Sequence, residues 1–164
     1  FYVMRTYAGS RFMTVFNAFY YSWSPYVADL IRESESMKFS ARIALAPLIG
    51  ILSMSEGLVS KLWSLNSEMA VVLGGVVASA LIGIVYLLPL MTLGVMLSSR
   101  FRKLITRISR KVVIGTWLLC IITLVIGVLG FIEVATMIAA SLLVLASLVG
   151  SSLGILRIAL NDSE

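Results

Sequence analysis

Three long runs of uncharged residues dominate the carboxyl-terminal half of the chain and constrain its fold most. They cover residues 69–99, 112–132 and 134–156. A helix needs about 20 apolar residues to cross the hydrocarbon core of a membrane, so each run is long enough for one span. Only 13% of the 164 residues are charged, against about 25% in soluble domains, and the mean hydropathy is +1.03. The sequence therefore predicts an all-α integral membrane protein.

The three runs predict different arrangements. Residues 69–99 exceed the length of an upright span, so we expect a tilted helix, or one that leaves the bilayer before it ends. We expect this helix to bend at Pro89, because proline removes a backbone donor. Glu133 alone separates the other two runs, which predicts a tight helical hairpin with this carboxylate at the membrane surface. We divide the chain into an amino-terminal region, residues 1–68, and a transmembrane helical bundle, residues 69–164.

A further apolar stretch, residues 43–55, leaves the number of spans open. It contains Pro47 and Gly50, and it reaches spanning length only by including Glu56. Its length is closer to that of a re-entrant or surface-lying helix than to that of a span. We therefore favour three spans, with a fourth span as the alternative.

Six basic residues without an acidic neighbour set the predicted orientation. They are Arg100, Arg102, Lys103, Arg107, Arg110 and Lys111. Short segments rich in Lys and Arg stay in the cytoplasm, so we predict a cytoplasmic basic loop, Glu133 outside and a cytoplasmic carboxyl terminus. With three spans residues 1–68 are extracytoplasmic, whereas a fourth span would place Phe1 in the cytoplasm. The net charge of +5 reflects this loop rather than a basic surface, so no nucleic-acid partner is expected.

Aromatic residues recur every three or four positions near the amino terminus. They are Phe12, Phe16, Phe19, Tyr20 and Trp23, and on a helix they form one stripe. Such residues favour the headgroup region, so we predict amino-terminal interfacial amphipathic helices on the outer surface. Packing of the stripe against the spans is a compatible alternative. Ser24 and Pro25 have the pattern of a helix start, which predicts a second short helix before a solvated connection at residues 32–42.

The segment at residues 9–29 contains the element Tyr-Tyr-x-x-Ser-Pro, preceded by a glycine and aromatic residues. It resembles the region that follows the Cys-Phe-Ile box in CFI-box proteins, especially archaeal ones. The matching residues are Gly9, Phe12, Phe19, Tyr20, Tyr21, Ser24, Pro25, Ala28 and Asp29. Residues 44–49, Ala-Leu-Ala-Pro-Leu-Ile, are similar to the family's next apolar segment, so the resemblance covers about residues 1–52.

This resemblance implies a carboxyl-terminal sorting or anchoring module that follows an exported domain. It also implies that residues 1–68 are extracytoplasmic, in agreement with the charge pattern. The Cys-Phe-Ile box itself would lie before Phe1, so no thiol-based role of the box can be assigned to a residue here. We expect Phe1 to follow a cleavage site or a disordered stretch.

The predicted spans lack residues that carry chemistry. No Asp, Glu, Lys, Arg or His interrupts them, and such groups are the usual pointers to transport or proton relay. The serines have no histidine to activate them, and we interpret Cys120 as an inert apolar residue of the interior. We therefore expect no catalytic residue, no metal site and no cofactor.

Small residues four positions apart predict close helix packing. One stripe contains Gly75, Ser79 and Gly83, and the other contains Ala146, Gly150 and Gly154. In lipid, small residues at this spacing let two backbones approach closely. The stripes pack on each other within one chain or against a different subunit, and the sequence leaves both open.

These features favour a non-enzymatic membrane anchor or accessory subunit. Its expected partners are the lipid bilayer and other membrane protein subunits. The alternative is a structural subunit of an archaeal respiratory or monooxygenase complex, in which other chains hold the reactive groups.

Overall fold

The computed structural model describes residues 2–107 and 110–161, which are helical without strands. The short 3-10 turn η1 (Val3–Arg5) precedes α1 (Tyr7–Glu33) and α2 (Glu35–Leu62). One irregular helix follows, made of α3 (Ser67–Ile82), the π-helical segment η2 (Gly83–Leu87) and α4 (Leu88–Leu97). The remaining helices are α5 (Ser99–Arg107), α6 (Arg110–Leu129) and α7 (Glu133–Asn161).

Four helices in the described part of the chain are long and apolar enough to cross a membrane. They cover Glu35–Leu62, Ser67–Leu97, Lys111–Leu129 and Glu133–Leu160. The predicted all-α membrane protein is thereby confirmed, and three of the four helices correspond to the predicted spans, although the helices ending at Leu97 and Leu129 stop two and three residues before the predicted ends. Residues 43–55 lie inside the 28-residue α2, and this helix is long and apolar enough to be the fourth span that the sequence left open.

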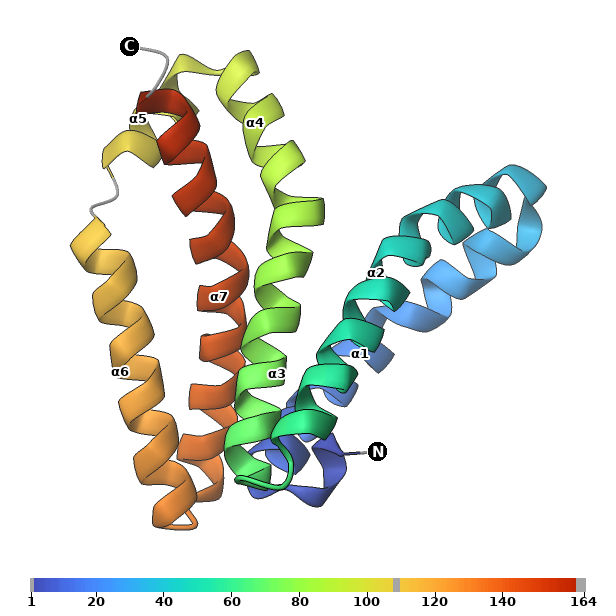
Figure 1. The fold of residues 1–164 in the computed structure, drawn as a ribbon. Helices are drawn as coiled ribbons and strands as arrows, with labels where there is room; N and C mark the ends of the chain where they lie inside the picture. Colours follow the sequence, from blue (N-terminus) through green and yellow to red (C-terminus); the bar gives the residue numbers. More distant parts are fainter. Residues whose placement is uncertain (1, 108–109, 162–164) are drawn as a thin grey trace.

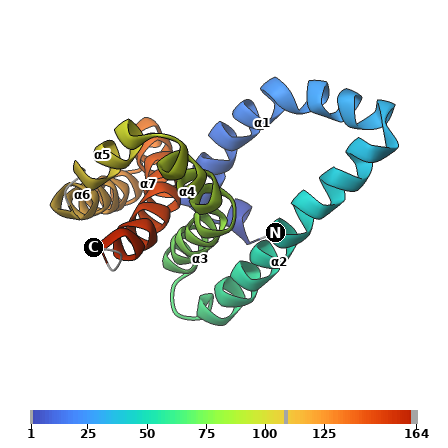
Figure 2. The same ribbon diagram turned by 90° about the horizontal axis from the view of Figure 1, so that it is seen from above.

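Three of these four helices form a bundle from which α1 and α2 project. In Figure 1 the α3–α4 helix, α6 and α7 run alongside one another, while α1 and α2 form an antiparallel hairpin directed away from them. We call this hairpin the amino-terminal arm. Figure 2 shows the arm extending to one side when the bundle is viewed along its length. The beginning of α1 lies at the same end of the bundle as the α6–α7 turn, and α5 lies at the opposite end (Figure 1).

The predicted helix start at Ser24 and Pro25 is wrong. Both residues lie inside α1, which continues to Glu33, and the break falls at Ser34, whose backbone is extended (φ −137°, ψ 128°). Proline removes one intrahelical hydrogen bond without forcing the helix to end. In an apolar environment a continuous helix is favoured because it satisfies the other backbone groups internally. Residues 32–42 are accordingly helical on both sides of Ser34 rather than an open connection.

The basic segment is also helical rather than a loop. Residues 99–107 form α5, whose Ile105 is 2% exposed and packs with Leu153 and Leu156 of α7. This apolar contact holds the segment against the bundle, which the run of charges did not suggest. The side chains of Arg107 and Arg110 lie outside the described part of the structure.

Two local irregularities correspond to predicted features. The π-helical segment η2 lies directly before Pro89, where π geometry accommodates the missing backbone donor. The predicted tight hairpin is confirmed, because α6 ends at Leu129 and α7 begins at Glu133. Phe131 in this turn has a φ of 51°, a left-handed conformation that is uncommon for a bulky residue.

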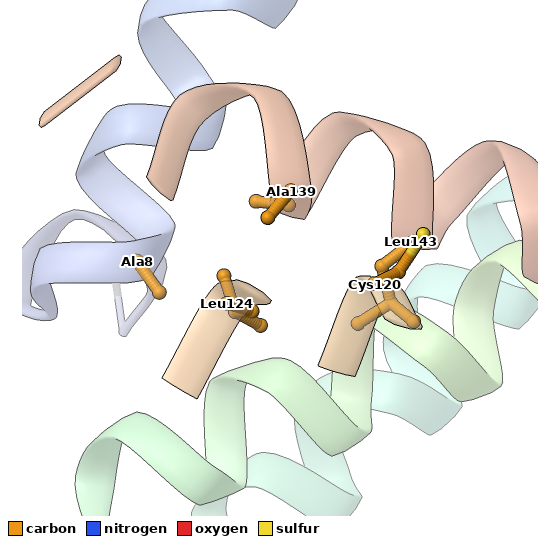
Figure 3. Packing of buried hydrophobic residues seen from close by; sticks show 6 residues of the cluster. Ala8, Cys120, Leu124, Ala139 and Leu143 are labelled. Carbon is orange, nitrogen blue, oxygen red and sulfur yellow. The ribbon is translucent and has the colours of Figure 1, made fainter. Parts of the chain in front are cut away.

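The main core joins the first helix to the last two. Ala8 of α1 packs with Cys120 and Leu124 of α6 and with Ala139 and Leu143 of α7. In Figure 3 Ala8 points toward Leu124 and Ala139, and Cys120 lies beside Leu143. A polar contact supports the same α6–α7 pair, since Trp117 Nε1 donates to Ser147 Oγ at 2.9 Å. The start of the arm is therefore part of the bundle's core.

Candidate partner interface

The base of the arm is fixed by a carboxylate from another helix. Glu68, in the first turn of α3, accepts hydrogen bonds from the backbone N–H groups of Tyr7 and Ala8, the latter at 3.1 Å. The Thr6 side chain accepts from Gly9 N at 3.2 Å, and Thr6 N itself donates to the Val3 carbonyl at 3.3 Å. All four N–H groups at the start of α1 are therefore satisfied, which a helix end cannot achieve by itself.

An ion pair links α1 to the α6–α7 hairpin. The Arg11 guanidinium donates to the Glu133 carboxylate, and their side chains are 31% and 59% exposed. The Arg11 guanidinium carbon lies 5.2 Å from the centre of the Tyr7 ring, which meets Phe131 edge-on at 5.5 Å. These contacts position α1 against the end of the bundle, and Glu133 lies at a helix boundary, as predicted.

One hydrogen bond joins the outer part of the arm to the bundle. The Tyr86 hydroxyl in η2 donates to the Ala44 carbonyl of α2. Pro47 lacks an N–H group, so the carbonyl of Ile43, next to Ala44, has no regular donor within the helix. The contact thus provides a donor where proline disturbs the helix.

The aromatic stripe begins in the core and continues along the exposed part of α1. Phe12 packs against the main core, and its ring stacks on Phe16 at 5.9 Å. Phe16 in turn stacks on Tyr20 at 6.1 Å, and Tyr20 meets Trp23 edge-on. The exposed fractions are 42% for Phe16 and 63% for Phe19. The first residue of the stripe, Phe12, therefore packs against the core, and the others are exposed.

The rest of the arm adds a large exposed apolar surface. On α2 it includes Met37, Phe39, Ile43, Leu45, Ile49, Leu52 and Met54. Only Ile51, Ser55 and Val59 of α2 are buried among the described residues. Val59 meets α3 where Gly74 leaves room, since a Cβ atom at Gly74 would lie 2.3 Å from Val59 Cγ2. Close packing of α2 is thus confined to its second half, and the first half carries apolar side chains that no described residue covers.

The small-residue stripes do not meet face to face. Gly83 approaches α7 closely, because a Cβ atom there would lie 2.1 Å from the Leu148 carbonyl oxygen. Ser151 Oγ donates to the Ala80 carbonyl at 3.0 Å at the same crossing, and Ser79 is buried. The partners of Gly83 are therefore Leu148 and Ser151 rather than the second stripe.

The other stripe residues lie elsewhere. A Cβ atom at Gly150 would be 3.4 Å from Val113 of α6, and Ala146 is half-buried. At Gly75 and Gly154 it would meet no described side chain or neighbouring helix within 4 Å. Sequence spacing therefore pointed to a crossing between the first and last predicted spans, but the α7 residues that meet Gly83 lie between the positions of the second stripe.

The described residues contain no group of three His, Cys, Asp or Glu side chains that could hold a metal ion. Cys120 is a free thiol, 6% exposed, in the apolar core. The notable arrangement is therefore the arm, which combines a fixed base with an exposed aromatic and apolar surface.

Sequence reasoning missed the polar contacts that fix the arm. Glu68 follows the helix N-cap Asn66 by two residues, a position where acids are common for helix-dipole reasons alone. Its link to α1 joins residues 60 or more positions apart, and no local pattern records such a pair.

No known protein family, curated protein or solved structure matches this chain.

Proposed function

We propose that the chain is a non-enzymatic membrane anchor or accessory subunit whose arm docks on a larger membrane or surface partner. The observation that carries this proposal is the exposed aromatic surface of α1, including Phe19 and Tyr21 at 63% and 68%. Extended exposed apolar patches mark protein or membrane contact sites. The fixed base supports the same function, because it presents the surface in one orientation.

The absence of Asp, Glu, Lys, Arg and His from residues 69–99, 112–132 and 134–156 also supports a structural role. Proton relays and ion-coupled transporters use such residues inside the membrane. The resemblance of residues 1–52 to CFI-box proteins is consistent with an anchoring role after an exported domain. In this proposal the arm contacts that domain or a subunit bound to it.

Site-specific photo-crosslinking in native membranes tests the docking. We expect a photoreactive amino acid at Phe19 to give a discrete protein adduct on illumination, because this ring projects from the arm. The matched control is Leu119 of α6, which is 64% exposed but lies on a span away from the arm. It should give only lipid adducts. Lipid adducts alone at both positions would contradict partner docking.

Mass spectrometry of the Phe19 adduct separates the two candidate partners. If the crosslinked protein is a surface or exported domain, the result supports the anchor function. If it is a subunit of a redox complex, the result supports the alternative, a structural subunit of a respiratory or monooxygenase assembly.

We further propose that α5 and the carboxyl terminus face the cytoplasm and that residues 1–68 lie on the outer side. The six basic residues at positions 100–111 support this orientation. The arm's tip, residues 29–38, contains only Arg32 and Lys38 as basic residues, together with three acids. It therefore carries no comparable signal for cytoplasmic retention.

Cysteine labelling tests this topology. We expect Ser36→Cys, in a Cys120→Ser background, to react with a membrane-impermeant maleimide in intact cells, because the tip lies outside. Ser64→Cys, in the α2–α3 turn, serves as a second outer position. If Ser64→Cys reacts in intact cells and Ser36→Cys reacts only after permeabilisation, α2 crosses the membrane and the proposed position of the tip is wrong.

A further inference from the structure

A pocket of about 290 Å³ lies between α5, α6 and α7, at the end of the bundle that carries the basic segment. Its walls are Ile105, Val113, Ile114, Leu153, Gly154 and Ile158. Apart from one cation these walls are apolar. One of its walls belongs to α5, which lies at the end of the bundle opposite the arm's base (Figure 1), so the pocket is separate from the proposed partner interface.

The missing side chain at Gly154 helps to form the pocket. A Cβ atom at this position would meet no described side chain or other helix within 4 Å, so α7 does not use this glycine to approach a neighbour. Ile114 and Ile158 at the edge are 59% and 58% exposed. These residues belong to helices that are long and apolar enough to cross a membrane, so in a bilayer we expect the exposed edge to face the lipid tails, where an acyl chain can enter from the side.

The cation at the pocket is Arg157, which is half-buried and follows the last apolar turns of α7. By sequence, the segments 100–111 and 157–164 together contain Arg157 and the six basic residues at positions 100–111, against Asp162 and Glu164. The balance of these charges is +5 (seven basic minus two acidic residues). Basic pockets between membrane helices on the cytoplasmic side recognise anionic lipid headgroups.

We propose that this pocket binds one anionic phospholipid, with an acyl chain between α6 and α7 and its phosphate beside Arg157. The apolar walls match the chain, and the local charge matches the headgroup. The polar carboxyl-terminal residues 161–164, Asn-Asp-Ser-Glu, are chemically unsuited to fill an apolar pocket. The bound lipid would connect α6 to α7 at the end where no short turn joins them.

Native mass spectrometry of the full chain, released from mixed micelles, tests the proposal. The probes are phosphatidylglycerol and phosphatidylcholine with identical acyl chains. We expect one phosphatidylglycerol molecule to remain bound in preference to phosphatidylcholine. Arg157→Gln should lower that preference about fivefold, because one basic residue near the phosphate is removed.

Gly154→Leu fills the pocket and should abolish the retained lipid. Its matched control is Gly115→Leu on α6, where a Cβ atom also meets no described neighbour within 4 Å but which does not line the pocket. If Gly154→Leu does not fold, Ile114→Trp is used in its place, because the larger side chain narrows the pocket from the opposite wall. Its control is Ile122→Trp on the same helix. Each control should retain the lipid.

Three results would overturn the proposal. Equal retention of the two lipids would remove the headgroup preference. If Gly154→Leu and Gly115→Leu retained equal amounts of lipid, the lipid would bind elsewhere. The same conclusion would follow from equal retention by Ile114→Trp and Ile122→Trp, the pair used if the glycine variants cannot be compared. A lipid-free dimer that Gly154→Leu converts to a monomer would show that a second copy occupies the pocket.

Discussion

Replacing Gly83 by leucine will destabilise the bundle by about 3 kcal/mol or more. The reason is the contact between η2 and α7, where even a Cβ atom would lie 2.1 Å from the Leu148 carbonyl oxygen and 2.7 Å from Ser151 Oγ. A backbone oxygen cannot rotate away as a flexible side chain can, so the two helices must separate. Separation would also break the Ser151–Ala80 hydrogen bond. Reversible unfolding in mixed micelles with increasing SDS measures the loss.

Gly75→Leu is the control for this prediction. Gly75 is two turns earlier in the same helical element, and a Cβ atom there meets no described side chain or neighbouring helix within 4 Å. The change from glycine to leucine has the same effect on helix propensity at both positions, so the difference between the variants reports the crossing. We expect Gly75→Leu to change the free energy of unfolding by less than about 1 kcal/mol. Equal destabilisation by both substitutions would exclude the Gly83–α7 contact as the cause.

Replacing Glu68 by alanine will release the first turn of α1 from the bundle. The substitution removes the acceptor of two backbone N–H groups, Tyr7 N and Ala8 N, at a helix end that is partly buried. Hydrogen bonds to a charged group contribute about 1.5–3 kcal/mol, so opening of this turn should increase about 10- to 100-fold. Labelling of Ala8→Cys by a maleimide in a Cys120→Ser background measures the opening, since Ala8 is 3% exposed.

Glu56→Ala is the matched control, because Glu56 is exposed on α2. It should leave the labelling rate of Ala8→Cys unchanged. Glu68→Gln keeps one side-chain acceptor and should have an intermediate effect. An unchanged labelling rate in Glu68→Ala would mean that Thr6 and the packing of Ala8 hold the turn without the carboxylate.

The spans could be predicted from the sequence because a bilayer imposes a length and a composition on every crossing helix. The turn at Glu133 and the helix irregularity at Pro89 could be predicted for a related reason. In lipid, both a charged side chain and a missing backbone donor have a large free-energy cost. The continuity of α1 through Pro25 could not be predicted from the sequence. The free-energy cost of proline within a helix depends on whether water or neighbouring groups donate to the carbonyl that loses its partner. The helical form of α5 depends on Ile105 finding Leu153 and Leu156, a contact between distant parts of the chain.

The same limit applies to the interfaces. Small residues at four-residue spacing identify a helix face suited to close approach, but the partner of Gly83 depends on the relative rotation of two helices. The aromatic stripe of α1 was evident from spacing. Its division between a core residue, Phe12, and exposed residues from Phe16 onward depends on where the arm leaves the bundle.

The contacts of α1 also impose an order on biosynthesis. Ala8 packs on residues 120–143, and Arg11 pairs with Glu133, 122 positions later in the chain. Because synthesis proceeds from the amino terminus, the first helix emerges long before these contacts can form. Final attachment of α1 therefore waits until the last helical hairpin has entered the membrane. Until then, chaperones and insertion factors have access to Ala8 and Phe12, the α1 residues that pack into the core of the finished bundle.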